Sequence, residues 1–163
     1  MKLRINTVNP DNMNFEFSFV ALILLVMLFV PNILWSRFPP KNYEKYSQNE
    51  NKLLLVFERI GQVLVVVFSL FCGVKFSLNP VLLVVIFLMI LYEIYWIRFF
   101  RSSRTMNDMN RSLFLIPLPG ATLPVAAFLL LGIFSNNIFL TLSSVLLGIG
   151  HIGIHAGHVR ELE

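Results

Sequence analysis

The stretch PVLLVVIFLMILYEIYWI, residues 80–97, decides the fold. Glu93 is its one charged residue, and its apolar residues form a continuous run without the polar alternation of an amphipathic segment. An α-helix rises about 1.5 Å per residue, so a run of this length covers most of the roughly 30 Å hydrocarbon core of a bilayer. The stretch therefore predicts a transmembrane helix.

Four further apolar runs resemble it in length and composition. Charged residues make up only 13% of the 163-residue chain, against roughly 25% in a soluble domain. We expect residues 1–163 to form one all-α integral membrane domain, a bundle of five transmembrane helices. The five predicted spans are residues 17–36, 53–74, 80–97, 113–134 and 138–157.

Lysine and arginine residues concentrate in two of the connecting loops. The loops 37–52 and 98–112 carry four each, whereas the 75–79 connection carries one and the 135–137 turn none. Positively charged loops remain in the cytoplasm, so the prediction is a multi-pass protein of the cell membrane with its N-terminus outside and its C-terminus inside. The basic residues form no stripe with exposed aromatic residues, so we expect the lipid bilayer and no nucleic acid as a partner.

Three histidines stand in the last run, in GIGHIGIHAGH, residues 148–158. His151, His155 and His158 are spaced i, i+4, i+7, which places them within about 60° of one another around a helix. Imidazole binds transition metals and also relays protons. Three interpretations stay open: ligation of a transition metal, the only cofactor that the sequence suggests, a role toward protons or substrate, and structural hydrogen bonding to neighbouring helices.

Glycines occupy another face of the same predicted helix. Gly150, Gly153 and Gly157 lie roughly 130° around the helix from the histidines. Small residues at this spacing let a second helix approach closely. We expect this face to pack against another helix, from this chain, from a second copy or from a partner membrane protein.

The segment IPLPGATLP, residues 116–124, predicts a helix break within the fourth run. It contains Pro117, Pro119, Gly120 and Pro124, and proline removes backbone donors from a helix. Broken membrane helices often border a cavity that satisfies the freed carbonyl groups. A kink that serves only packing is the alternative.

Five polar residues share one depth, a few residues from the predicted cytoplasmic boundary. They predict a cytoplasm-facing pocket lined by Glu58, Gln62, Glu93, His151 and His155. The alternative is that Glu58 and Gln62 reach out to water from a helix end, while Glu93 forms an ion pair with an arginine.

A pocket open to one side favours a protein that binds a ligand, an ion or a partner over a channel, which needs polar residues at both ends. Two alternatives remain. The first is a metal-dependent intramembrane enzyme, or a metal or proton transporter, that uses the histidines with Glu58 or Glu93 as acid–base. The second is a membrane subunit of a larger transport complex.

The segment PNILWSRFPPKNYEKYSQNENKLLLVFERIGQ, residues 31–62, resembles a group of small, uncharacterised bacterial multi-pass integral membrane proteins. In that group a helix ends in an Asn-Ile pair, a basic loop rich in Tyr and Asn follows, and the next helix opens with a Glu-x-Ile-Gly-like turn. The matching residues are Asn32, Ile33, Glu58, Ile60 and Gly61. The resemblance implies membrane helices and no particular activity.

Overall fold

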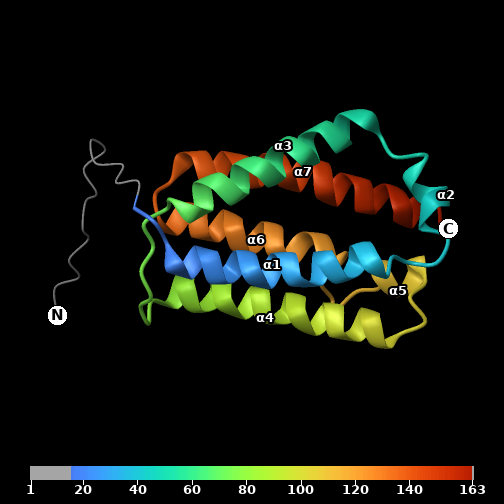
Figure 1. Ribbon diagram of the computed structural model, residues 1–163, viewed down its shortest axis with the longest axis horizontal. Coiled ribbons are helices and arrows are strands. Elements are labelled where there is room, and N and C mark those ends of the chain that lie inside the picture. The colour runs from blue at the N-terminus through green and yellow to red at the C-terminus, as the bar shows by residue number, and fades with distance from the viewer. Residues whose placement is uncertain (1–15, 163) are drawn as a thin grey trace.

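The computed structural model describes residues 16–162, and this part of the chain is built from helices. Five long helices lie side by side and two short ones cover one end of the bundle (Figure 1). The prediction of an all-α fold is thus confirmed for the described residues. The helices are α1 (Phe19–Arg37), α2 (Tyr43–Ser47), α3 (Lys52–Leu70), α4 (Pro80–Arg101), α5 (Met106–Asn110), α6 (Pro119–Phe134) and α7 (Ile138–Arg160).

Four of the long helices, α1, α3, α4 and α7, are long and apolar enough to cross a membrane. The fifth, α6, is equally apolar but has 16 residues, because it begins six residues later than the predicted span 113–134. These lengths and compositions are those of a multi-pass membrane protein.

Asparagine side chains mark where three of the long helices begin. Asn51, Asn79 and Asn137 each accept a hydrogen bond from backbone N–H groups in the first turn of α3, α4 and α7 respectively. Asparagine is among the strongest N-cap residues because its side chain satisfies an N–H group that has no partner within the helix. Pro80 then follows at the first position of α4, where a missing N–H costs nothing.

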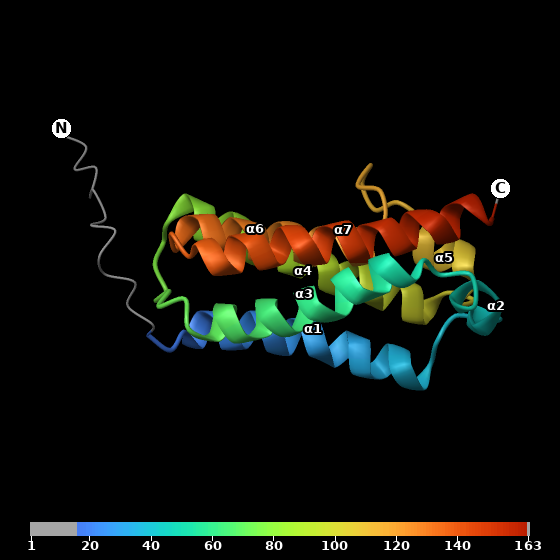
Figure 2. The same ribbon diagram turned by 90° about the horizontal axis from the view of Figure 1, so that it is seen from above.

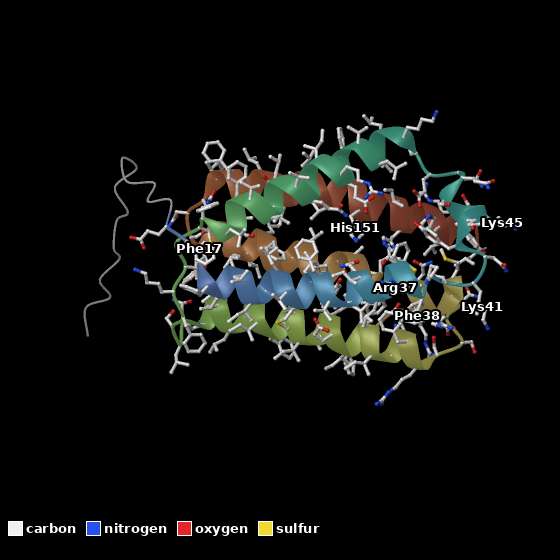
Figure 3. The ribbon with its side chains drawn as sticks, in the orientation of Figure 1. Phe17, Arg37, Phe38, Lys41, Lys45 and His151 are labelled. Atoms are coloured by element: carbon white, nitrogen blue, oxygen red, sulfur yellow. The ribbon has the colours of Figure 1, made fainter. Side chains whose placement is uncertain are left out.

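The two basic loops lie at the same end of the bundle. This end, called the basic end below, consists of α2, α5 and the last turn of α7 (Figures 1 and 2). Lys41 and Lys45 lie there, and Phe17 lies at the opposite end (Figure 3). Lys2 and Arg4, whose positive charges argue mildly against an N-terminus outside the cell, lie outside the described residues.

Helices α3 and α7 touch along most of their length through glycines. A Cβ atom at Gly61 would lie 2.6 Å from the Cα of Leu147, and one at Gly150 would lie 2.6 Å from the carbonyl oxygen of Leu54. Gly153 faces the Leu54 side chain. No atom of the described chain lies within 4 Å of a Cβ at Gly157, so its packing role stays a prediction for a second copy or a partner protein. Its turn of α7 lies beyond the start of α3.

The predicted helix break lies at residues 113–118. There Leu113 and Ile116 form an isolated bridge, and Leu118 has a left-handed backbone with φ of 46°. Helix α6 then starts at Pro119 and runs without interruption through Gly120 and Pro124, so the prediction that these two residues break the helix is wrong. Gly120 instead lets the Tyr95 ring approach, since a Cβ there would lie 2.7 Å from that ring.

Candidate functional site

A cavity of about 160 Å³ lies inside the bundle toward the basic end. Helices α3 and α7 supply most of its polar lining, and α1, α4 and the segment that joins α2 to α3 close its other sides. His151 of α7 points into the interior of the bundle (Figure 3). We call this space the polar cavity; its carboxylate, guanidinium, imidazole and amide side chains are Asn32, Glu50, Glu58, Arg59, Gln62, His151, His155 and His158.

Two histidines of α7 pair with two glutamates from other parts of the chain. Nδ1 of His151 lies 2.5 Å from Oε1 of Glu58 on α3. Nε2 of His158 lies 3.0 Å from Oε1 of Glu50, in the segment before α3. A buried carboxylate is costly unless a partner satisfies it. Each glutamate has such a partner, so the two pairs also tie α7 to the α2–α3 region.

Glu50 has a second partner in Tyr43 of α2. The Tyr43 hydroxyl donates a hydrogen bond to Oε1 of Glu50 over 3.1 Å. Burial, and after it the neighbouring Glu50 carboxylate, raises the pKa of Tyr43 well above its ordinary value. The hydroxyl therefore keeps its proton at neutral pH and remains a donor.

His155 lies between the two pairs. Its ring centroid is 4.8 Å from that of His151 and 5.9 Å from that of His158, so the three imidazoles form a file along α7. Within residues 16–162, no group of three or more His, Cys, Asp or Glu side chains is placed to hold a metal ion. The proposed metal set of His151, His155 and His158 is therefore not assembled, because the outer two rings turn to different glutamates.

Glu93 does not line the polar cavity, and its predicted place there is wrong. Tyr95 and Trp96 of α4 turn toward the cavity and leave Glu93 at the edge of that face. The alternative ion pair with an arginine is not formed among the described residues either. The nearest arginine in sequence, Arg98, donates to backbone carbonyl groups, over 2.6 Å in the case of Arg111. Oε1 of Glu93 is buried without a hydrogen-bond partner among the described residues.

Comparison with protein-family models, with curated proteins and with solved structures found no match. The chemistry of the site therefore follows from its geometry alone. That geometry joins four residues of the predicted pocket, Glu58, Gln62, His151 and His155, in one lining.

Several residues that line the polar cavity could not be predicted from their position along a helix. Glu50 and Tyr43 belong to a polar loop, where no periodicity signals burial. Trp35 and Trp96 stand near helix ends, where tryptophan commonly marks the membrane–water boundary. The chain has two tryptophans, and both line the polar cavity. The rarity of tryptophan in this chain is the one signal in the sequence that could have pointed to Trp35 and Trp96.

The lining groups without partners are mostly donors. The indole N–H groups of Trp35 and Trp96 are buried and have no acceptor within the described part of the chain. Arg59 lines the cavity and forms no ion pair with any described residue. Glu50 and Glu58, in contrast, each have a histidine as hydrogen-bond partner. The cavity thus offers free N–H groups to an acceptor.

Proposed function

We propose that this chain is a multi-pass protein of the cell membrane that binds a small-molecule ligand in the polar cavity. In this proposal all five long helices cross the bilayer and the basic end faces the cytoplasm. The four-against-one distribution of basic residues between the loops supports the orientation. Helix α6 covers roughly 24 Å at the usual helical rise, close to the thickness of a bilayer's hydrocarbon core.

One observation carries the binding proposal: a polar cavity lies among ionisable residues at membrane depth. Ionisable side chains inside a membrane protein are costly and usually mark a functional site. Two Glu–His pairs could serve only to tie helices together, but such a site has no need of a cavity of about 160 Å³. It also has no need of two buried indole N–H groups without acceptors, because native interiors satisfy nearly all such groups. A ligand with acceptor atoms accounts for both.

The geometry favours binding over the metal-dependent enzyme. Structural and catalytic zinc sites need at least three protein ligands around one point. Among the described residues no three ligand side chains converge on one point. His151 and His158 each direct a ring nitrogen to a different glutamate.

The orientation is tested by labelling single cysteines with a membrane-impermeant maleimide. Cys72→Ala removes the one native cysteine, and Lys45→Cys or Leu78→Cys then places a thiol at the basic or at the opposite end. In intact cells we expect label at position 78 alone, and at position 45 only after permeabilisation. Label at position 45 in intact cells overturns the proposed orientation.

Binding is tested by mass spectrometry of the solvent extract of protein purified from membranes. Ile154→Trp fills the cavity, and Leu142→Trp adds the same bulk to an outward-facing position of the same helix as a matched control. We expect the wild type and the control to release a common compound in near-stoichiometric amount, and Ile154→Trp to release at least about ten-fold less, the equivalent of about 1.4 kcal/mol. Where Ile154→Trp fails to fold, His155→Phe replaces it. Extracts that are the same for all proteins overturn the binding proposal.

A further inference from the structure

A second hollow, of about 270 Å³, adjoins the polar cavity. The two share five lining residues, Asn32, Trp35, Arg59, Gln62 and His151, and therefore lie directly beside each other. Beyond the shared residues the second hollow is lined mostly by apolar side chains, with Ser36 and Tyr92 as the two that carry hydroxyl groups. We call it the lateral groove, and its apolar part is made by Leu28, Phe29, Val65, Val66 and Phe128.

The lateral groove exists because α3 leans away from α1. The two helices are tied together at the end opposite the basic end, where the N–H of Ser18 donates to the carbonyl of Leu70 over 2.8 Å. Toward the basic end, α3 packs against α7 instead, and the two helices approach closely at Gly61 and Gly150. Figures 1 and 2 both show α1 and α3 separating toward the basic end. The groove between them opens to the side of the bundle, through exposed residues such as Phe29 and Arg59.

Polar and apolar parts of this space occur in the order found in a membrane lipid. Along α3, Arg59 and Gln62 lie nearer the basic end than the groove residues Val65 and Val66. Along α1, Asn32 and Trp35 likewise lie nearer that end than Leu28 and Phe29. A cavity of about 160 Å³ admits a headgroup but no complete lipid, so an acyl chain has to lie in the groove. Small-molecule sites are typically mostly apolar with a few polar groups that fix orientation.

The lining side chains that have no partner among the described residues indicate the charge of the headgroup. Arg59 has no carboxylate partner among the described residues, and a guanidinium binds phosphate oxygens through two parallel hydrogen bonds. The indole N–H of Trp96, a residue 5% exposed, adds a buried donor without an acceptor. A cationic headgroup would need a free carboxylate, and Glu50 and Glu58 are both paired.

We infer that the ligand is an anionic phospholipid, which enters from the bilayer between α1 and α3 and places its phosphate at Arg59 and its acyl chain in the lateral groove. This inference rests on the proposed function and names its ligand class. The lipid contacts Trp35 where the groove and the polar cavity meet. The fluorescence of the two native tryptophans therefore reports its arrival.

The experiment reconstitutes the full-length protein into phosphatidylcholine vesicles that contain a low fraction of brominated lipid, since bromine quenches indole fluorescence on contact. Brominated phosphatidylglycerol is compared with brominated phosphatidylcholine at the same fraction. We expect at least about three-fold stronger quenching by the anionic lipid, and a ratio near one for Arg59→Gln. Arg101→Gln, which removes a charge at the same end but outside the cavity, retains the wild-type ratio.

A second pair of variants tests the groove itself. Val66→Phe narrows it without adding an indole, whereas Val63→Phe adds the same ring to an outward-facing position of α3. The preference for the anionic lipid is lost in the first and kept in the second. Free glycerol 3-phosphate, added to unbrominated vesicles, leaves the wild-type spectrum unchanged.

The outcomes separate this inference from the proposed function. Equal quenching by both lipids in the wild type, or a preference that survives Val66→Phe, overturns the lipid. A spectral change with glycerol 3-phosphate alone assigns a water-soluble ligand and overturns the lipid as well. In both cases the proposed function stands if the extract of the wild type still differs from that of Ile154→Trp, and it fails if the extracts are the same.

Discussion

His158 and Glu50 lie 108 positions apart in the sequence, yet Nε2 of the histidine is 3.0 Å from Oε1 of the glutamate. Their side chains are only 3% and 8% exposed. The contact joins the last turns of α7 to the segment before α3. It encloses the basic end of the polar cavity with a loop that would otherwise be solvated.

Glu50→Ala is therefore expected to destabilise the protein, because it leaves both His158 and Tyr43 without their partner. Loss of one member of a buried hydrogen-bonded pair costs about 2–4 kcal/mol. Thermal unfolding in detergent measures the loss. Glu44→Ala, an exposed glutamate of the neighbouring helix, serves as the control and should shift stability by less than about 0.5 kcal/mol. Equal effects of the two substitutions would contradict a structural role of the Glu50 pair.

Two glycines of α7 should respond to alanine in opposite directions. Gly150→Ala places a methyl group against the backbone of α3 and forces the two helices apart, so we expect a loss of about 1–3 kcal/mol. Gly157→Ala meets no atom within 4 Å and gains helix propensity, so we expect a gain of up to about 1 kcal/mol. The same thermal unfolding measurement compares them. Destabilisation by Gly157→Ala would indicate a partner helix on that face.

Metal removal should leave the protein unchanged. The three histidines of α7 do not converge on one point, and two of them face separate glutamates. We expect no stoichiometric transition metal by elemental analysis, and no change in melting temperature after dialysis against EDTA. A His151→Ala/His155→Ala variant should have the same metal content as the wild type. A stoichiometric metal that disappears in this variant would restore the metal-dependent enzyme or transporter.

The short helix α5 should depend on pH through its first turn. Asp108 accepts hydrogen bonds from the backbone N–H and the hydroxyl of Thr105, and these bonds lower its pKa below the ordinary value. A lowered pKa in the folded state means that the carboxylate stabilises α5 at neutral pH, and that this contribution is lost as the pH falls through that pKa. Asp108→Ala should cost α5 about 1 kcal/mol at neutral pH and nothing in strong acid.

Hydrogen exchange of the 102–112 peptide measures this local effect. Asn107→Ala changes an exposed neighbour that takes no part in the cap and should leave the exchange rates as they are. If the two variants exchange alike at neutral pH, the capping box does not stabilise α5.

The long helices were predictable because continuous apolar runs and N-cap asparagines are local signals. The runs beginning near residues 53, 80 and 138 correspond to α3, α4 and α7 within a few residues at each end. Helices α2 and α5 were not predictable from periodicity, since each has five residues. The start of α6 was placed too early because residues 113–118 are apolar but form an irregular turn.

Part of the site was predictable for a similar reason. Depth along a helix follows from counting residues, and it grouped Glu58 and Gln62 with His151 and His155, four residues that line one cavity in the structure. Depth does not give direction around the bundle, which is why Glu93 was wrongly included. Burial of Glu50 depends on how a polar loop folds back over a helix end. No local pattern in the sequence encodes that contact.

The pairing of α3 with α7 also has a consequence for the order in which the molecule is built. Among the described helices α7 is the last to be synthesised, and it supplies every histidine of the polar cavity. Until α7 enters the membrane, Glu50 and Glu58 lack the imidazoles that pair with them, and α3 lacks the helix that holds it away from α1. The nascent chain therefore carries an incomplete site through most of its synthesis, and one late insertion event both supplies the partners of the glutamates and opens the groove.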